Sequence, residues 1–420
     1  MREMKDSGIE WIGKAPAKWN YVRGKYILKY VQKPVKINDG VITCFRNGEV
    51  TLRSNRREEG FTMANKEIGY QGVDVGDLVV HGMDGFAGAI GISDSRGKAS
   101  PVLNVLDSTE NKRYVMYYLR SMAYGEVFSA LATGIRVRSC DLRWNKLSEL
   151  MYPVPPLDEQ QNIVFFLDNK CSKIDTIVAD IQKEIEILEQ YKRSIITEAV
   201  TKGLTPDVEM KNSGLRWCEK IPATWEVIPA KYLFHNSDTR KFPNDELLTA
   251  SQKYGLISQT DYMKRENAKI VLANAGIENW KHVEPNDFVI SLRSFQGGLE
   301  MSEISGCVTW HYVVLRAAQK VFQRYYKWLF KSSKYINALQ ATCNFIRDGQ
   351  DLRFSNFAKV PLFIPPYKEQ CEIAAYLDEK TTAIDVVMQS KKKQLEVLDS
   401  YKKSLIYEYV TGKKEVPYES

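Results

Sequence analysis

The sequence predicts an α+β protein with two globular α/β domains that are related by an internal pseudo-two-fold repeat. Two long antiparallel coiled-coil helices are predicted to separate these domains. An internal repeat, together with two long runs without proline or glycine, supports this fold class. A chain of 420 residues has room for several domains of roughly 100–200 residues each. We place the globular domains at residues 1–152 and 206–363, and the helical regions at residues 153–205 and 364–420.

The repeat consists of two matched blocks. Residues 4–26 match residues 210–232 at 11 of 23 positions. Residues 155–201 match residues 365–411 at 20 of 47 positions. Between the blocks the similarity fades. The matched blocks of each copy therefore form a shared frame around two divergent interiors. Drift after duplication explains this pattern, and so does a pair of domains that each recognise something different.

Each copy of the second block opens with Pro-Pro-x-x-Glu-Gln and then continues without proline or glycine, over residues 157–202 and 367–411. Proline favours the first turn of a helix, and acidic side chains favour its N-terminus. Gly203 and Gly412 follow the two runs, where a left-handed C-cap is expected. Apolar residues recur every seven positions, as in coiled coils, at Ile174, Ile181, Leu188 and Ile195. The second run has Ile384, Leu398 and Leu405 at the same spacing, with Lys391 interrupting it once.

About 45 residues at ~1.5 Å each give a helix of roughly 65 Å, which is longer than a small domain is wide. Two such helices with similar sequences most simply pack on each other, and a pseudo-two-fold relation makes them antiparallel. The alternative is that each helix packs separately on its own domain.

The interiors have the pattern of mixed α/β structure. Short apolar or alternating segments bounded by Gly and Asp predict strands at residues 35–41, 77–81, 87–93, 288–292 and 307–315. Residues 114–122 and 324–330 have a helical pattern.

Charge is unevenly distributed along the chain. Residues 1–150 carry a net charge of +6 and residues 206–364 carry +5, whereas residues 151–205 carry −3 and residues 365–420 carry −1. The two basic blocks suggest two contacts with a polyanion such as DNA, and the acidic helices suit protein partners better. A net charge of this size is also common among soluble domains.

The sequence lacks the motifs that are typical of several functional classes. The seven scattered cysteines form no Cys-x-x-Cys pair, the four histidines lie far apart, and there is no Gly-x-x-x-x-Gly-Lys-Ser/Thr loop. We therefore expect no catalytic residue and no metal site. The charged start and the lack of a long apolar run lead us to expect a cytoplasmic protein without a membrane contact.

Taken together, these features resemble the specificity subunit of type I restriction–modification systems. The resemblance rests on the Met-Lys-x-Ser-Gly-x-x-Trp start, the Trp three positions after Pro, and Pro-Pro-x-x-Glu-Gln before a long helix. Each mark occurs twice in the same order, and the resemblance covers essentially the whole chain.

The resemblance implies a non-catalytic DNA reader. Each target recognition domain would bind one half of a bipartite, asymmetric double-stranded DNA site. The helical rod would set the spacing and dock two methyltransferase subunits. These would carry S-adenosylmethionine, so this chain would bind no cofactor itself. Restriction (motor) subunits would join the complex for cleavage.

DNA contacts should come from Arg, Lys and Asn side chains in polar loops of the two interiors. Our candidates are Arg53, Asn55, Arg56, Arg57, Arg136, Arg138, Arg143, Arg240, Lys241, Lys264, Arg265, Arg293, Arg347 and Arg353. Arg143 and Arg353 are equivalent in the repeat, so a shared role in backbone contact or in structure is expected for them. Solvated surface charge is the alternative for each residue.

On the helices, we predict a partner-binding surface that includes the Glu-Gln motifs and the heptad stripe. Its residues are Glu159, Gln160, Ile174, Ile181, Leu188, Tyr191, Glu369, Gln370, Ile384, Leu398, Tyr401 and Leu405.

Three other functions remain as alternatives. The chain could serve a related system in which a nuclease and a methyltransferase share one partner polypeptide. It could be a coiled-coil adaptor that does not bind DNA. A self-sufficient methyltransferase would have to bind S-adenosylmethionine itself, and the missing motifs disfavour it.

Overall fold

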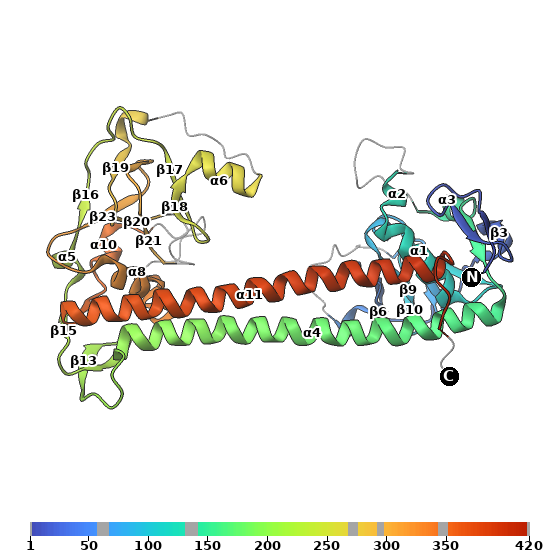
Figure 1. Ribbon diagram of the computed structural model, residues 1–420, viewed down its shortest axis with the longest axis horizontal. Coiled ribbons are helices and arrows are strands. Elements are labelled where there is room, and N and C mark those ends of the chain that lie inside the picture. The colour runs from blue at the N-terminus through green and yellow to red at the C-terminus, as the bar shows by residue number, and fades with distance from the viewer. Residues whose placement is uncertain are drawn as a thin grey trace. The chain divides into compact units, whose positions relative to one another are not determined.

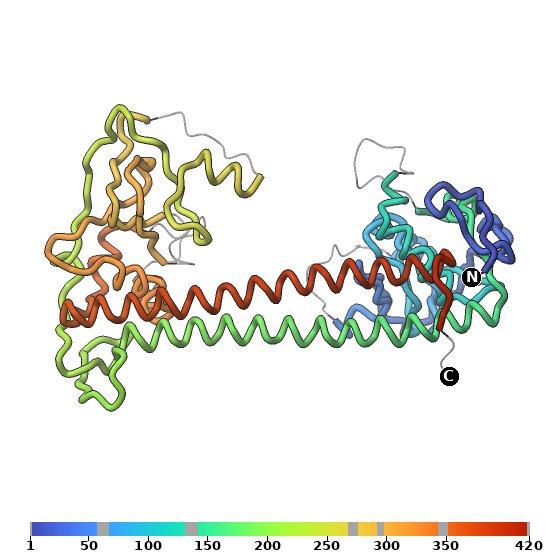
Figure 2. Tube along the Cα trace, viewed as in Figure 1, coloured from blue at the N-terminus to red at the C-terminus, as the bar shows by residue number. Residues whose placement is uncertain are grey.

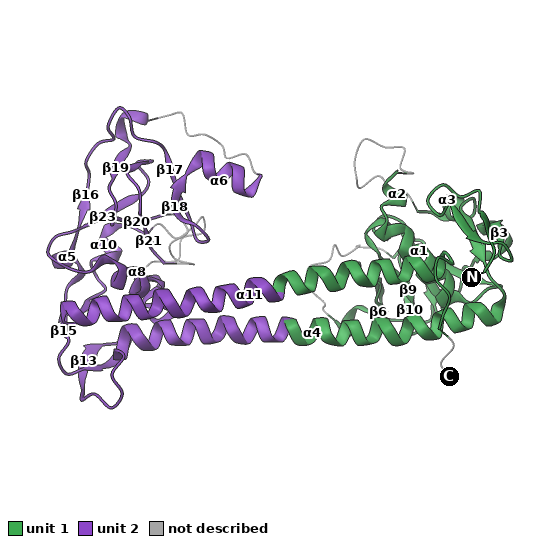
Figure 3. Cartoon of the chain, in the orientation of Figure 1, with its two compact units in different colours: residues 1–181, 392–420 green, residues 182–391 purple. Residues whose placement is uncertain are grey.

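The computed structural model describes residues 2–56, 67–130, 142–267, 276–291, 298–342 and 352–417. The chain divides into two compact units, coloured separately in Figure 3. Unit 1 comprises residues 1–181 and 392–420, and unit 2 comprises residues 182–391. The chain therefore starts in unit 1, forms unit 2 and returns to unit 1, as the colour gradient of Figure 2 shows.

Unit 1 is built around a four-stranded antiparallel sheet in the order β4-β11-β8-β9. Helix α1 (Lys112–Tyr124) packs on this sheet through a buried face that begins with Tyr114. Asn111 caps α1 by accepting the backbone N–H of Arg113 at 3.0 Å. The sheet strands are β4 (Leu28–Tyr30), β8 (Leu78–His81), β9 (Ile90–Ile92) and β11 (Leu103–Ser108).

Four antiparallel strand pairs complete the β-structure of unit 1 in its described residues (Figure 1). They are β1 (Met4–Asp6) with β2 (Lys14–Pro16), β3 (Asn20–Arg23) with β12 (Met151–Val154), β5 (Ile42–Cys44) with β6 (Val50–Leu52), and β7 (Gln71–Val73) with β10 (Gly97–Ala99). Two short helices, α2 (Val127–Ala130) and α3 (Trp144–Leu147), follow α1.

Unit 2 repeats this topology. Its four-stranded sheet has the order β16-β23-β20-β21, which matches the sheet of unit 1 strand for strand. These strands are β16 (Phe234–Ser237), β20 (Phe288–Ile290), β21 (Glu300–Met301) and β23 (Val313–Ala317). The strand pairs are β13 (Met210–Leu215) with β14 (Cys218–Pro222), β15 (Glu226–Ile228) with β24 (Leu362–Ile364), β17 (Leu248–Ser251) with β18 (Gly255–Ser258), and β19 (Lys281–Val283) with β22 (Gly306–Val308).

Besides its parts of the two long helices, the helices in the described residues of unit 2 are α5 (Ala230–Leu233), α6 (Gln259–Glu266), α8 (Gln323–Lys331), α9 (Ser333–Gln340) and α10 (Phe354–Phe357). Helices α8 and α9 take the place of α1 and α2, and α10 takes the place of α3. Helix α6 follows the hairpin β17–β18, and the 3₁₀ turn η2 (Arg53–Asn55) follows the equivalent hairpin β5–β6. The repeat predicted from the sequence is confirmed.

Most of the predicted interior elements are present, including the helices α1 and α8. The strand predicted at residues 35–41 is wrong, because Asp39 accepts the backbone N–H of Lys36 at 2.8 Å and folds this segment into a turn. Pairing begins only at Ile42. The single strand predicted at residues 307–315 is also wrong, because a turn at Trp310 divides it into β22 and β23.

The two long helices are α4 (Leu157–Lys202) and α11 (Tyr367–Val410), which confirms both predictions (Figure 1). Gly203 and Gly412 follow them with φ of 77° and 71°, in the left-handed conformation expected of a C-cap. The four-segment division predicted from the sequence treats the helices as separate regions. In the structure, each helix contributes one part to unit 1 and the other part to unit 2.

Within each unit, the beginning of one long helix packs against the end of the other. In unit 1, Lys402 Nζ of α11 lies 2.5 Å from Asp175 Oδ1 of α4. In unit 2, Lys192 Nζ of α4 lies 2.6 Å from Asp385 Oδ2 of α11. The two ion pairs are repeat-related, and both fit an antiparallel arrangement of α4 and α11. In the heptad stripe, Ile174, Ile181, Ile195, Ile384 and Leu405 are buried, and Leu188 and Leu398 are half-buried.

Candidate nucleic-acid interface and helical frame

The two sequence motifs of the repeat meet in each unit. Trp19 Nε1 donates to Glu159 Oε2 at 3.0 Å, and Trp225 Nε1 donates to Glu369 Oε2 at 2.9 Å. Both indole rings are buried, with 1% and 0% of their surface exposed. A buried indole N–H needs an acceptor, and a carboxylate provides a strong one. The glutamate of Pro-Pro-x-x-Glu-Gln thus fastens the globular part of each unit to the start of a long helix.

The glutamine of the same motif is a buried bridge. Gln160 Oε1 accepts the backbone N–H of Asn111 at 2.9 Å, and its Nε2 donates to the Pro155 carbonyl at 2.9 Å. Gln370 does the same with the Phe322 N–H and the Pro365 carbonyl, each at 2.8 Å. In both units the amide side chain therefore joins the long helix to the segment before α1 or α8.

Tyrosine hydroxyls complete the frame, and the sequence analysis missed them. Tyr114 Oη donates to the Val410 carbonyl at 2.9 Å, and Tyr325 Oη donates to the Val200 carbonyl at 3.0 Å. These carbonyls belong to the last turns of α11 and α4, where helix acceptors lack partners within the helix. Each globular part thus binds the start of one long helix and the end of the other. The repeat held the signal, since both tyrosines fall early in a predicted helix.

The predicted partner-binding residues of the helices fall into two groups. Tyr191 and Tyr401 are exposed, at 54% and 53%. The apolar heptad positions and the Glu-Gln motifs make contacts inside each unit. A role of these residues in partner binding stays a prediction, and only the exposed ones present a free side-chain face.

In unit 1, the structure groups Arg53 and Arg56 with Arg46, which the sequence analysis did not single out. Together with His81, they line a cavity of 520 Å³ beside the hairpin β5–β6. Arg46 Nη2 lies 2.8 Å from Asp84 Oδ1. Burial lowers the pKa of His81, whose Nδ1 accepts the backbone N–H of Asp84 at 2.9 Å. The neutral ring therefore shapes the turn beside the arginines.

Arg56 is held from two sides. Its Nη1 donates to Glu49 Oε2 at 3.0 Å, and its guanidinium carbon lies 4.1 Å from the centre of the Phe45 ring. Asn55 donates to the Thr51 hydroxyl at 2.9 Å. Arg56 and Asn55 are exposed, so the hairpin presents preorganised polar groups to solvent.

In unit 2, Lys264 and Arg265 lie on α6, which follows the equivalent hairpin. None of the eight residues of α6 is buried. Lys253 Nζ and Tyr254 Oη of the hairpin donate to Glu266 at 2.8 and 2.7 Å, and the Arg265 guanidinium lies 5.2 Å from the Tyr254 ring. The repeat therefore brings candidates from both units to one topological position, immediately after the second hairpin strand.

The other described candidates occupy different places. Arg240 donates to the Asn279 carbonyl at 3.0 Å, and Lys241 follows it on the segment paired with β19. Arg143 and Arg353 are exposed residues at the N-caps of α3 and α10, in equivalent positions. Arg57, Arg136, Arg138, Arg293 and Arg347 lie outside the described residues.

A polar cluster fixes the loop before β5 in unit 1. Arg96 binds Asp39 at 2.8 Å and Asp74 at 2.5 Å, and Lys33 binds Asp74 at 2.8 Å. Hydrogen bonds from Lys33 and Arg96 lower the pKa of Asp74 to about 2. A hydrogen bond from Arg96 also lowers the pKa of Asp39. The loop that carries Lys36 is thus tied to the β7–β10 pair.

Among the residues described, no group of three or more His, Cys, Asp or Glu side chains is arranged to hold a metal ion. Of the helices in the described ranges, none is both long and apolar enough to cross a membrane.

Comparison with known proteins identifies the domain. Residues 222–397 match the family model of the type I restriction modification DNA specificity domain. The chain is 24% identical to the type I restriction enzyme MjaVIII specificity subunit of Methanocaldococcus jannaschii, over 96% of this chain and 94% of that protein. It is 22% identical to the putative type I restriction enzyme MjaX specificity subunit of the same organism, over 72% of this chain and 68% of that protein.

A solved structure has the same fold. It comes from work on complex assembly and conformational transition of the type I R-M system, and it aligns with a TM-score of 0.68 at 13% identity. The alignment covers 95% of this chain and 99% of that chain. The chain is thus similar along its length to type I restriction–modification specificity subunits, and its residues 222–397 match their DNA specificity domain, which confirms the resemblance predicted from its sequence motifs.

Proposed function

We propose that this chain is the non-catalytic DNA-reading subunit of a type I restriction–modification complex. Its two globular parts each read one half of a bipartite, asymmetric site in double-stranded DNA. One observation carries this proposal: the hairpin position that is equivalent in the repeat bears different basic groups in the two units. Unit 1 presents Arg46, Arg53 and Arg56 there, and unit 2 presents Lys264 and Arg265 on α6. Equivalent frames with unlike reading surfaces suit two unlike half-sites.

The chemistry of these groups fits DNA. Guanidinium groups bind phosphates and can pair with the O6 and N7 atoms of guanine, and lysine supplies point charges to phosphates. Arg56 and Arg46 are already oriented by carboxylates, so less side-chain entropy is lost on binding.

The long helices are proposed to set the spacing of the half-sites and to dock two methyltransferase subunits. A continuous helix of 46 residues is roughly 69 Å long at ~1.5 Å per residue. This exceeds one turn of duplex DNA, about 34 Å, so α4 is long enough to serve readers on successive turns. S-adenosylmethionine then belongs to the methyltransferase, and restriction subunits join for cleavage. The complex is proposed to act on DNA in the cytoplasm.

The test is reconstitution. The chain is coexpressed with a methyltransferase subunit of a type I system from the same genome, and the mass of the purified complex is measured by light scattering. We expect two methyltransferases per chain and salt-sensitive binding to a subset of duplexes in a random pool. If the assembled complex shows no preference among DNA sequences, the chain would be a structural adaptor only. S-adenosylmethionine binding by the isolated chain would indicate a methyltransferase instead.

A further inference from the structure

We infer that the start of α4 in unit 1 forms a docking groove for an acidic, apolar segment of the methyltransferase subunit. The matching start of α11 in unit 2 carries different side chains, so the two methyltransferases bind with unequal affinity. This inference rests on the proposed function and adds to it the position and the chemistry of one docking site.

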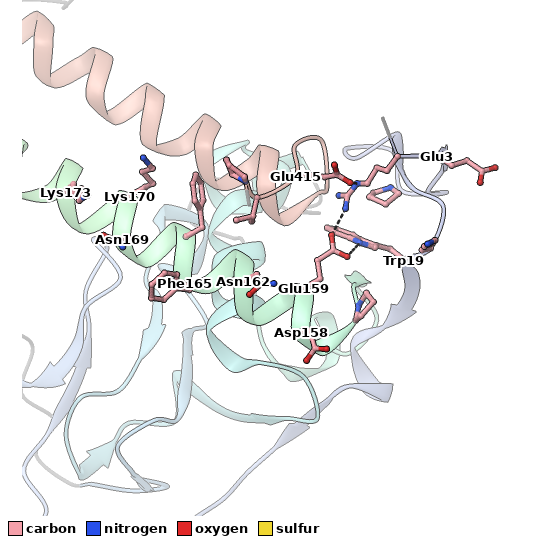
Figure 4. Close-up of a pocket in the computed structure, with 17 residues that line it drawn as sticks. Glu3, Trp19, Asp158, Glu159, Asn162, Phe165, Asn169, Lys170, Lys173 and Glu415 are labelled. Carbon is pink, nitrogen blue, oxygen red and sulfur yellow. Dashed lines mark hydrogen bonds and ion pairs between the residues drawn. The ribbon is translucent and has the colours of Figure 1, made fainter. Parts of the chain in front are cut away.

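The groove is a cavity of 760 Å³ in unit 1. The first turns of α4, the segment around Trp19 and the C-terminal residues 415–417 line it (Figure 4). Phe165 lines the cavity, and 67% of its surface is exposed. The neighbouring Phe166 is anchored to Tyr409 of α11, with ring centres 4.5 Å apart. The cavity thus offers one fixed aromatic ring and one accessible ring to a ligand.

Charges differ between the two ends of the groove. Figure 4 shows Lys170 and Lys173 at one end, and Trp19 and Glu415 at the other. At the Trp19 end, Arg2 is shared by Glu159 and Glu415 at 2.5 and 3.6 Å. Glu3, Asp158 and Lys18 also line the cavity there, so this end carries more carboxylates than cations.

The opposite end is basic, because Lys170 and Lys173 line it. Lys170 Nζ lies 5.6 Å from the centre of the Phe166 ring. In the ranges that the structure covers, neither Lys170 nor Lys173 forms an ion pair with a carboxylate. A ligand that places an apolar side chain on Phe165 and carboxylates beside the two lysines complements this surface.

The repeat provides an internal comparison. Ala375 of α11 stands at the position of Phe165, and both positions are exposed. Ala383 stands at the position of Lys173. Glu372 and Glu379 replace two asparagines, Asn162 and Asn169, that line the groove of unit 1. Lys380 stands at the position of Lys170, so one of the two lysines is kept. The start of α11 therefore lacks the accessible aromatic ring and one lysine, and it has carboxylates in place of the two asparagines, which disfavours an acidic ligand. A partner that presents the same segment at both places binds the first more tightly.

The experiment is a titration of the full-length chain with the methyltransferase subunit, followed by native mass spectrometry and calorimetry. We expect two steps whose constants differ by more than the statistical ratio for identical sites, with a populated 1:1 complex. Phe165→Ala should weaken the tight step roughly 10-fold or more, because large apolar anchors dominate such interfaces. Lys170→Glu with Lys173→Glu should weaken the same step.

Ala375→Phe is the converse variant, and it should strengthen the weak step. Ile187→Ala serves as the matched control, because Ile187 is an exposed apolar residue of the same helix, at 54%, outside the groove. Each of these positions is exposed, so circular dichroism should show unchanged folding.

The outcomes separate this inference from the proposed function. Two equal sites, or a tight step that ignores both Phe165→Ala and the lysine reversal, would overturn the inference and leave the DNA-reading role intact. A chain that binds no methyltransferase at all would overturn both.

Discussion

Trp19 and Glu159, which are 140 residues apart in the chain, are joined by a hydrogen bond of 3.0 Å that is repeated in the second unit by Trp225 and Glu369. The tryptophan of the first repeated block and the glutamate of the second therefore form one contact in each unit. It fixes each globular part on the helix start that follows it. A frame kept constant in this way leaves the hairpin surfaces of the two units free to differ.

The first prediction concerns this contact. Glu159→Ala leaves the buried Trp19 N–H without its acceptor, which costs about 1–3 kcal/mol of unfolding free energy. Urea unfolding followed by tryptophan fluorescence measures the loss. Glu186→Gln, an exposed change on the same helix, is the control and should have little effect. Equal stability of the two variants would mean that the frame does not depend on this bond.

The second prediction compares two kinds of contact between the long helices. Ile384 is 8% exposed, and Ile384→Ala should cost about 2–5 kcal/mol because it leaves a cavity. Lys192→Ala removes an ion pair with the half-exposed Asp385 and should cost less than about 1 kcal/mol. Thermal and urea unfolding of both variants decide the order. If the lysine variant loses more stability, ion pairs rather than the apolar stripe hold the helices together.

The third prediction concerns DNA binding by the assembled complex. Arg46→Ala and Arg56→Ala should each weaken specific binding by about 1–3 kcal/mol if they contact bases, or lower the salt slope by about 1 if they contact phosphate. Lys264→Ala tests the equivalent position in unit 2. Arg193→Ala on the exposed surface of α4 is the control. Binding isotherms at several salt concentrations measure both effects. Unchanged affinity in all three test variants would mean that the hairpins do not contact DNA.

The fourth prediction concerns acid stability. The pKa of Asp74 is lowered to about 2 from an ordinary value of 3.8, so its ionised form stabilises the folded state at higher pH. This contribution is lost as the pH falls from about 4 to about 2. Arg96→Gln removes hydrogen bonds to Asp74 and Asp39, so its melting temperature should fall less steeply over this range than that of the wild type. Melting curves at each pH measure the difference, and parallel slopes would contradict this cause.

The long helices could be predicted closely from the sequence, because proline, glycine and heptad spacing act locally. The strand at residues 35–41 could not, since the Asp39 turn competes with the β pattern of Val35 and Ile37. The split between β22 and β23 at Trp310 escaped for a similar reason, because an apolar run does not show where the chain turns.

The candidate interface was predicted only in part. Arg53 and Arg56 stood out as a cluster in the sequence, whereas Arg46 joins them only because β5 and β6 fold back on each other. The Glu-Gln motifs were assigned to partner binding, yet Gln160 is fully buried as a bridge to Asn111. Residues that recur in both copies build the contacts that the two units share. Contacts between residues far apart in the chain, such as Gln160 with Asn111, leave no local pattern in the sequence.

Single-molecule sequencing of DNA methylation tests the central claim most directly. A host that expresses this chain with its methyltransferase should gain methylation at one asymmetric motif, made of two specific blocks separated by unspecified bases. Arg46→Ala with Arg56→Ala should relax one block only, and Lys264→Ala with Arg265→Ala should relax the other. A continuous motif, no new motif, or a simultaneous change of both blocks by either variant would contradict the account of two independent readers on one helical frame.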